Sequence, residues 1–246
     1  MNKKLIFLEY LFLCFLISLL LSGILFLRKN AIVYYSILKP NFEISVFLKL
    51  NVSSPEIIFE KIRSFEEIKK VELITKDKIK DKLNHLKNEI LLIDENPFPD
   101  CFIVVPQKID SKTVQSIVSG LNKIDGIEEI KYDANLVKII ENLEVIIKFL
   151  KFVLLVCGSI IIVLFISAIV IKIDNINEII DIMKQKYFYL KNAVGLAGFI
   201  LSFILIEIFR VKFFERNIFM ALSAKEIIIV FILTFLFNLW KIFKEG

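Results

Sequence analysis

The run LIFLEYLFLCFLISLLLSGILFL, residues Leu5–Leu27, indicates the fold class of this chain. A bilayer has a hydrocarbon core of roughly 30 Å, and a helix needs about 20 predominantly apolar residues to cross it. A lone segment in lipid must also satisfy its own backbone hydrogen bonds, which a helix does. We therefore expect this run to form a membrane-spanning helix.

Three more apolar runs follow late in the sequence, at Phe149–Ile171, Leu190–Phe209 and Ile227–Trp240. The first two have the length of a span, and the third reaches it when extended to Glu226 and Phe243. The chain is thus expected to be an α-helical membrane protein with four spans and one extramembrane domain. Its expected parts, in order, are a tail at 1–4, a span at 5–27, the extramembrane domain at 28–148, a span at 149–171, a connecting segment at 172–189, a span at 190–209, a loop at 210–225, a span at 226–243 and a tail at 244–246.

The composition agrees with a membrane class and argues against a nucleic-acid-binding face. Hydrophobic residues make up 57% of the 246 residues, above the norm for soluble proteins. The net charge is +5, and the segment from Arg28 to Lys151 holds 20 Lys and Arg against 19 Asp and Glu. Nucleic-acid binding needs a basic stripe, which this balance does not supply. The three cysteines have no motif spacing and are expected to be buried small side chains.

The first run is expected to be an uncleaved anchor whose N-terminus lies in the cytoplasm. It is longer than the roughly 7–15-residue apolar core of a signal peptide, and no A-x-A site closes it. In this orientation the cytoplasmic segments carry eight lysines: Lys3, Lys4, Lys172, Lys184, Lys186, Lys191, Lys241 and Lys244. The short outer loop carries four basic residues: Arg210, Lys212, Arg216 and Lys225. This excess favours the same orientation, although Arg28 and Lys29 on the outer side oppose it.

The extramembrane domain begins with a strand, a helix and a second strand. Phe42–Leu50 is rich in β-branched and aromatic residues and predicts a strand. Ser54 is expected to cap a helix that has Pro55 at its first position. Proline suits this position because the first residue of a helix does not need the backbone N–H that proline lacks. Val71–Ile74 predicts the second strand.

The second half of the domain repeats this order. Phe102–Val105 is strand-like, Asp110 or Ser111 is expected to cap a helix through Leu121, and Ile127–Tyr132 predicts the last strand. The segments 65–74 and 121–130 align without a gap at an offset of 56 residues. Two βαβ units predict a ferredoxin-like α+β domain with a helical insertion between the units.

The insertion is expected to hold a helix from Thr75 to about Asn88, followed by a Pro-rich segment, Glu89–Asp100. Apolar side chains in such a segment either form a patch that docks a protein partner or cover the core of their own domain. Both interpretations remain open. The apolar residues concerned are Leu91, Leu92, Ile93 and Phe98.

Two helical connectors are predicted between the domain and the spans. Ala134–Phe149 has no helix breaker and runs into the second span, and Ala31–Leu38 extends the first. The first connector has an apolar stripe: Leu136, Ile139, Ile140, Leu143, Ile146, Ile147 and Leu150. The connectors either pack together and carry motion, or simply tether the domain.

Lys172–Lys191 predicts a short amphipathic helix between spans two and three. Ile176, Ile179, Ile180 and Met183 recur at helical spacing, with acidic residues between them. Such a helix either inserts into a groove on a partner protein or lies on the lipid surface. Its acidic face disfavours attachment to anionic lipid.

The sequence lacks the motifs of several enzyme classes. It contains no G-x-x-x-x-G-K-[ST] phosphate loop, no H-E-x-x-H and no G-x-S-x-G. The single histidine, His85, lies in a polar stretch and is expected to be solvated. Glu207 lies in an apolar run three residues before Arg210 and is expected to pair with it. We expect no catalytic residue, metal or cofactor.

The order of one span, an outer domain and three spans resembles the cell-division protein FtsX family. Local motifs resemble the same family in order: Phe42–Leu50, Val71–Ile74 leading into Thr75-Lys76-Asp77, Asn96-Pro97-Phe98-Pro99 followed by Cys101–Val105, Ile124–Ile130, and Ile180–Lys184. The N-P-x-P turn is the most specific of them. The family continues the last motif with L-V-G-A, where this chain has Gln185-Lys186-Tyr187-Phe188.

The resemblance implies a non-catalytic subunit of an ABC-type complex in the bacterial cytoplasmic (inner) membrane, at the division septum, with both termini cytoplasmic. It implies that an FtsE-like ATPase drives movement of the outer domain, which activates peptidoglycan hydrolases directly or through an adaptor. Other divisome proteins and a second copy of the chain are further implied partners, and nucleic acid is not. The residues expected to contact the ATPase are Glu178, Ile179, Ile180, Asp181, Ile182 and Met183. Those expected to contact the outer partner are Leu91, Leu92, Ile93 and Phe98.

Two other functions remain open from the sequence. One is a permease subunit of a related ABC exporter of lipoprotein or small molecules, a class that typically carries a much larger outer domain. The other is a stand-alone membrane-anchored receptor, which would not need the amphipathic helix near residues 176–183.

Overall fold

The structure is a computed structural model that describes residues 3–50, 52, 54–76, 78, 99–173, 176–213 and 220–245. The chain divides into two compact units. Met1–Val33 and Val145–Gly246 form one, which we call the helical unit, and Tyr34–Glu144 form the other, the sheet unit.

The helical unit is built from four long helices and one short one. The long helices are α1 (Lys3–Leu38), α6 (Ala134–Ile173), α8 (Lys186–Phe213) and α9 (Ala224–Glu245). The short helix, α7 (Ile176–Lys184), connects α6 to α8. All four long helices have the length and apolar composition needed to cross a bilayer. Each predicted span, at 5–27, 149–171, 190–209 and 226–243, lies within one of them.

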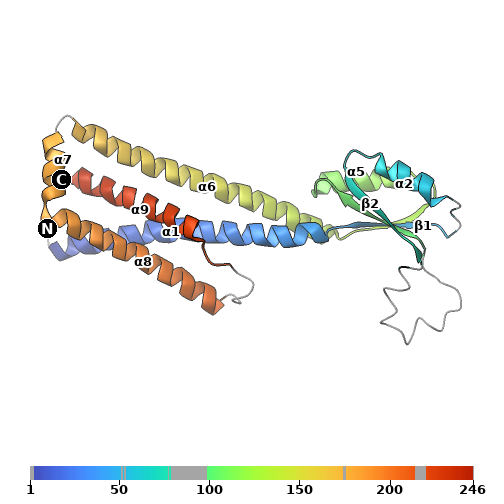
Figure 1. The fold of residues 1–246 in the computed structure, drawn as a ribbon, viewed down its shortest axis with the longest axis horizontal. Helices are drawn as coiled ribbons and strands as arrows, with labels where there is room; N and C mark the ends of the chain where they lie inside the picture. The colour runs from blue at the N-terminus through green and yellow to red at the C-terminus, as the bar shows by residue number, and fades with distance from the viewer. Residues whose placement is uncertain are drawn as a thin grey trace. The chain divides into compact units, whose positions relative to one another are not determined.

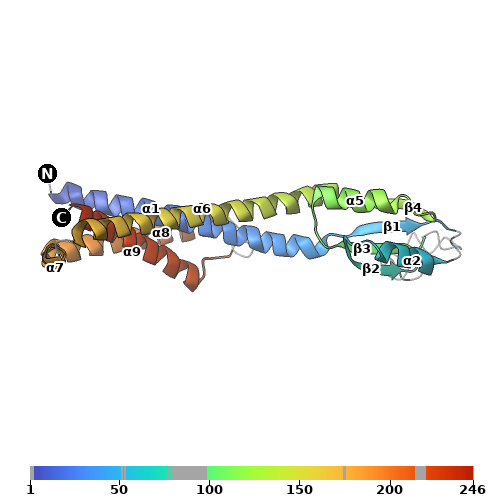
Figure 2. The same ribbon diagram turned by 90° about the horizontal axis from the view of Figure 1, so that it is seen from above.

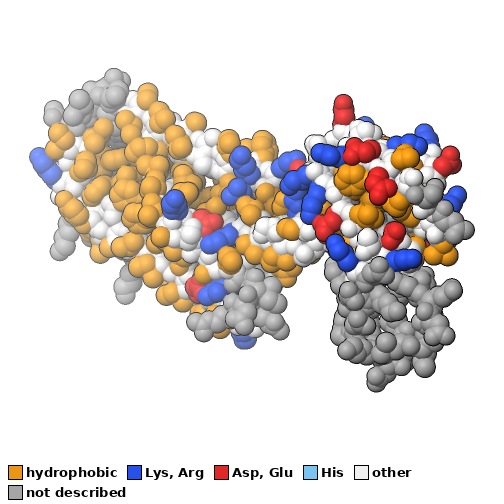
Figure 3. Space-filling view, turned by 45° about the vertical axis from the view of Figure 1, so that its right-hand side comes forward, with side chains coloured by type: hydrophobic (Ala, Val, Ile, Leu, Met, Phe, Trp, Pro, Cys, Tyr) orange, Lys and Arg blue, Asp and Glu red, His pale blue; other side chains and the backbone are white. Residues whose placement is uncertain are grey.

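Much of the surface of the helical unit is apolar. Large side chains such as Phe152, Val163 and Ile204 are at least half exposed, and orange hydrophobic atoms cover most of the visible face of these helices in Figure 3. Apolar patches of this size are unusual on water-soluble monomers, whereas a bilayer favours them. The apolar helices are consistent with a multi-pass membrane protein.

Two apolar clusters hold the helices together. In one, Leu21 and Leu25 of α1 are buried with Ile161 of α6 and Val230 of α9. The other lies near α7 and contains Tyr10, Ala168, Ile182, Ile242 and Phe243. Each cluster combines α1, α6 and α9, so these three helices share one interior.

The sheet unit contains a four-stranded antiparallel sheet. Its strands are β1 (Ile44–Leu48), β2 (Ile68–Ile74), β3 (Cys101–Pro106) and β4 (Ile127–Lys131), in the order β2-β3-β1-β4. Every neighbouring pair is antiparallel. All four strands arise where the sequence predicts them, and β1 and β3 stand between the strands of the other half-repeat.

Two helices cover one face of this sheet (Figure 1). They are α2 (Pro55–Arg63) and α5 (Ser111–Leu121), which bury Ile62 and Ile117 against alternate residues of β1 and β3. Pro55 begins α2 and Ser54 occupies the N-cap position, as predicted, but the Ser54 side chain makes no capping hydrogen bond.

The ends of the two connectors belong to the same core. After α1 a short 3₁₀ turn, Lys39–Asn41, leads into β1, and Tyr35 and Leu38 pack against the core of the sheet unit. At the start of α6, Val137 and Ile140 are buried there. The buried positions follow the predicted stripe only in part: Ile140 and Leu136 join the core, whereas Ile139 and Ile146 are 48% and 46% exposed.

Candidate functional site

The α7 segment was the main site expected from the sequence, and it lies across one end of the helical unit. Figure 1 shows it at an angle to the long helices, and Figure 2 shows it nearly end-on. Only Gln185 separates it from α8. The turn is held by hydrogen bonds from the Gln185 N–H to the Ile182 carbonyl and from the Phe188 N–H to the Gln185 carbonyl.

The two faces of α7 differ in burial. Ile182 is 5% exposed and packs with Tyr10 and Ala168, and Ile179 is half-buried against the same cluster. Ile180 and Met183 are 41% and 46% exposed. These apolar side chains therefore point away from the interior of the helical unit.

Burial divides the predicted contact residues of α7 into two groups. Ile182 is committed to the interior of the helical unit, so it is not available to a partner without a rearrangement of α7. Ile180, Asp181 and Met183 remain as exposed residues on one turn. The structure describes the backbone of Glu178 but not its side chain. The predicted outer-contact residues Leu91, Leu92, Ile93 and Phe98, and also His85, lie outside the described residues.

A polar cluster that the sequence analysis missed lies beneath α7. The Lys241 ammonium is 2.5 Å from a Glu9 carboxylate oxygen and lies 4.7 Å from the centre of the buried Tyr10 ring. Lys191 lies 4.8 Å from the centre of the same ring. Glu9 is a carboxylate within the first apolar run, and a carboxylate in such a run is a signal that could have indicated a partner in another helix.

A second group of polar side chains joins α1, α8 and α9 closer to the middle of the spans. The Asn238 amide donates to Asn192, and its oxygen accepts from the Cys14 thiol. The hydroxyls of Ser18 and Ser202 are 2.6 Å apart. Hydrogen bonds between helices are the usual means by which buried polar groups are satisfied in lipid, so these contacts define which helix faces meet.

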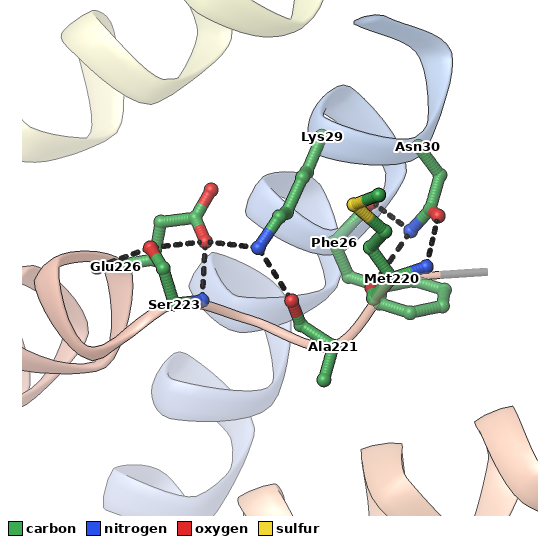
Figure 4. A network of polar contacts seen from close by, with 7 residues as sticks. All are labelled: Phe26, Lys29, Asn30, Met220, Ala221, Ser223 and Glu226. Carbon is green, nitrogen blue, oxygen red and sulfur yellow. Dashed lines mark hydrogen bonds and ion pairs between the residues drawn. The ribbon is translucent and has the colours of Figure 1, made fainter. Parts of the chain in front are cut away.

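At the opposite end from α7, the segment before α9 is bound to α1 (Figure 4). The Asn30 amide donates to the Met220 carbonyl and its oxygen accepts from the Met220 N–H. Lys29 donates to the Ala221 carbonyl and lies 3.4 Å from the Glu226 carboxylate. We call these contacts the α1–α9 clasp.

The clasp includes a capping box at the start of α9. The Glu226 carboxylate accepts from the backbone N–H and hydroxyl of Ser223, which is the S-x-x-E arrangement that satisfies free donors at a helix start. Glu207 and Arg210 form the predicted ion pair, at 2.7 Å.

In the sheet unit, charged groups gather at the start of α5. The Asp110 side chain accepts from the Thr113 N–H and hydroxyl and lies 3.0 Å from the Lys108 ammonium. Burial raises the pKa of Asp110, but these hydrogen bonds outweigh it and lower the pKa below its ordinary value. The Ser111 hydroxyl donates to Glu141, which ties α5 to the start of α6.

The described residues do not form a metal-binding constellation. Within the described ranges, no three His, Cys, Asp or Glu side chains are grouped to hold an ion. Cys14, Cys101 and Cys157 are free, and burial raises the pKa of the Cys101 thiol.

The family of the sheet unit follows from comparison with known proteins. Residues 41–144 match the family described as the FtsX extracellular domain. This part of the chain belongs to the FtsX family. The match includes all four strands and both helices of the sheet unit, and it confirms the family that the sequence motifs resemble.

Two solved structures are similar to the FtsX extracellular domain of this chain. One is a crystal structure of extracellular domain 1 of FtsX from Streptococcus pneumoniae in complex with undecyl-maltoside, with 19% identity, coverage of 37% of this chain and 93% of that one, and a TM-score of 0.33. The other is a solution structure of the large extracellular loop of FtsX from the same organism, with 18% identity, coverage of 37% and 98%, and a TM-score of 0.32. At these values the assignment rests on the family match. No curated protein matches the chain.

Proposed function

We propose that this chain is the non-catalytic membrane subunit of an ABC-type complex that acts in cell division. In this proposal, a cytoplasmic ATPase like FtsE drives a movement that the chain passes to its outer domain, and that domain activates peptidoglycan hydrolases directly or through an adaptor. The FtsX extracellular domain at residues 41–144 is the observation that carries the proposal, because it implies an FtsEX-type component.

The proposed orientation places both termini and α7 in the cytoplasm and the FtsX domain outside the cytoplasmic membrane, at the division septum. The excess of lysines on the α7 side supports it. Lys29, which opposes this bias, is engaged with Glu226 in the clasp. Its charge therefore has a local partner.

We assign the outer domain to the ferredoxin-like class, and the strand order β2-β3-β1-β4 with antiparallel neighbours supports that assignment. For the outer partner we keep the proposed contact at Leu91, Leu92, Ile93 and Phe98. Its support is the apolar, Pro-rich sequence of that segment.

The proposed ATPase contact is the exposed face of α7. Ile180 and Met183 are apolar side chains that would fill a groove on the partner, and Asp181 would meet a basic residue there. Ile179 and Ile182 support this face from behind, since both pack into the helical unit. A second copy of the chain and two ATPase copies are what the family implies for the assembly.

Co-purification tests this proposal. The tagged chain is purified from membranes beside Asp181→Lys/Met183→Asp, and co-eluting proteins are identified. The matched control is Glu56→Lys/Ile57→Asp, which makes the same kinds of change at exposed positions of α2. We expect an ABC ATPase with the wild type and the control and its loss from the α7 variant. Absence of an ATPase from all three samples would contradict the proposal.

A further inference from the structure

An apolar groove lies between α6 and α9, at the end of the helical unit that bears α7. Its volume is about 390 Å³, within the range of ligand-binding pockets. Ala168, Ile171 and Leu164 of α6 form one wall, and Trp240 and Phe243 of α9 form the other. The groove is therefore apolar along its length and bounded by two membrane-spanning helices.

Two polar side chains line the groove, and they differ in their hydrogen bonding. The Ser167 hydroxyl donates to the Leu164 carbonyl at 2.7 Å, so its donor is already used within α6. Lys244 is exposed, and its ammonium lies 5.2 Å from the centre of the Trp240 ring. Among the described side chains, no carboxylate forms an ion pair with Lys244.

Comparison with Lys241, one turn earlier in α9, shows what is unusual about Lys244. The side chain of Lys241 is 9% exposed and its ammonium is matched by Glu9. Lys244 has the same charge at the mouth of an apolar groove, and its ammonium lies beside an aromatic ring with no carboxylate paired to it among the described side chains. A groove with this lining favours a ligand that is apolar along most of its length and anionic at one end.

We propose that this groove binds an anionic phospholipid of the leaflet on the α7 side. Tryptophan is enriched at the level of lipid headgroups, and lysines near helix ends extend toward that level. An acyl chain would lie against Ala168 and Phe243 while the phosphate meets Lys244. A headgroup without a cation is favoured, because a choline group would place a second positive charge near the ammonium.

The lipid would also support α7. Ala168 and Phe243 line the groove and pack in the same cluster as Ile182 of α7. An acyl chain in the groove would therefore contact the same residues that pack against α7. Binding itself is independent of the proposed ATPase contact. Only the identification of the leaflet as cytoplasmic rests on the proposed function.

Native mass spectrometry of the lipid-stripped full chain in detergent tests this. Palmitoyl-oleoyl phosphatidylglycerol and the phosphatidylcholine with the same acyl chains are titrated separately. Lys244→Gln should weaken phosphatidylglycerol binding about fivefold, which corresponds to about 1 kcal/mol for a lysine near an anionic headgroup. Its control is Lys225→Gln, an exposed lysine at the other end of α9, which should leave the affinity unchanged.

A second pair of variants tests the groove itself. Ser167→Phe places a ring in the groove and should remove retention of the first bound lipid of either kind. Ser159→Phe, at an exposed position of α6 outside the groove lining, should retain it. Equal affinity of the wild type for both lipids would overturn the proposal. So would a loss no greater in Lys244→Gln than in Lys225→Gln, or equal retention by the two phenylalanine variants.

Discussion

Gly198 sets the distance between α1 and α8. A Cβ atom at this position would lie 2.7 Å from the Leu11 carbonyl oxygen and 3.0 Å from the Phe15 nitrogen. Both are backbone atoms, so they cannot move aside as the end of a flexible side chain can. The close approach of these helices therefore requires glycine here, as is common where small residues let membrane helices meet.

Gly198→Ala should destabilise the helical unit. The added methyl forces α1 and α8 apart, and overpacking of this kind costs about 1–3 kcal/mol. Thermal unfolding of the full chain in detergent measures the effect. Gly23→Ala is the control, because a Cβ there meets no atom within 4 Å. A loss of stability no larger for Gly198→Ala than for Gly23→Ala would contradict the packing argument.

Asp110 should make the start of α5 sensitive to acid. Its pKa is lowered in the folded protein, so its stabilisation is present above the ordinary pKa of about 3.9 and is lost as the pH falls through the folded pKa. Asp110→Ala removes the cap and should cost about 1 kcal/mol at neutral pH.

Hydrogen exchange of the α5 amides, corrected for intrinsic rates, follows this between about pH 3 and pH 7. The difference in protection between the wild type and Asp110→Ala should shrink as the pH falls. Asp110→Asn separates charge from capping, since an asparagine cap does not titrate. A difference between wild type and Asp110→Ala that is constant over this range would contradict the electrostatic account.

Single residues were predictable from the sequence where their partners are close in the chain. Asp110 caps a helix that follows it, and Glu207 pairs with a residue three positions on. Glu9 and Lys241 are 232 positions apart, and Cys14 and Asn238 are 224 apart. No local pattern relates such residues, because their contact depends on how separate helices pack.

At the scale of elements, the clasp fixes the segment before α9 on α1. Asn30→Leu removes both hydrogen bonds to Met220 while keeping the number and branching of the side-chain heavy atoms. The amides of residues 220–223 should then exchange faster by at least several-fold, since a lost hydrogen bond is worth about 1 kcal/mol. The measurement is peptide-resolved hydrogen exchange in detergent, with Asn41→Leu, in the 3₁₀ turn after α1, as the exposed control. Unchanged protection in Asn30→Leu would show that other contacts hold the segment.

The elements themselves were largely predictable, because strand and helix patterns are local. The two half-repeats gave all four strands, and the absence of a breaker gave α6. The inward face of α7 was not predictable. Ile179 is at helical spacing from Ile182, and the adjacent Ile180 is at the same spacing from Met183. Periodicity therefore gives two candidate apolar pairs and does not say which one faces the interior.

At the scale of the whole molecule, α6 is the proposed route for movement between ATPase and outer domain. A Gly-Gly insertion after Asn142 should weaken the helix by about 1 kcal/mol per glycine and rotate its two parts by about 200°. Hydrolase activation in cells, scored by division, should be lost while exchange protection of β3 and α5 persists.

The control is a four-alanine insertion at the same place, which is helical and rotates the two parts to within about 40° of a full turn. It should retain more function than the Gly-Gly insertion. Unchanged division with the Gly-Gly insertion would contradict the transmission of movement through α6.

The central claim is that the exposed face of α7 meets the ATPase. The direct measurement is photocrosslinking in cells with benzoylphenylalanine placed at Ile180 or Met183, and at Ile57 of α2 as an exposed control. The account predicts a crosslink from Ile180 and Met183 to an ABC ATPase and none from Ile57. No ATPase crosslink from either α7 position, or the same crosslink from Ile57, would contradict it.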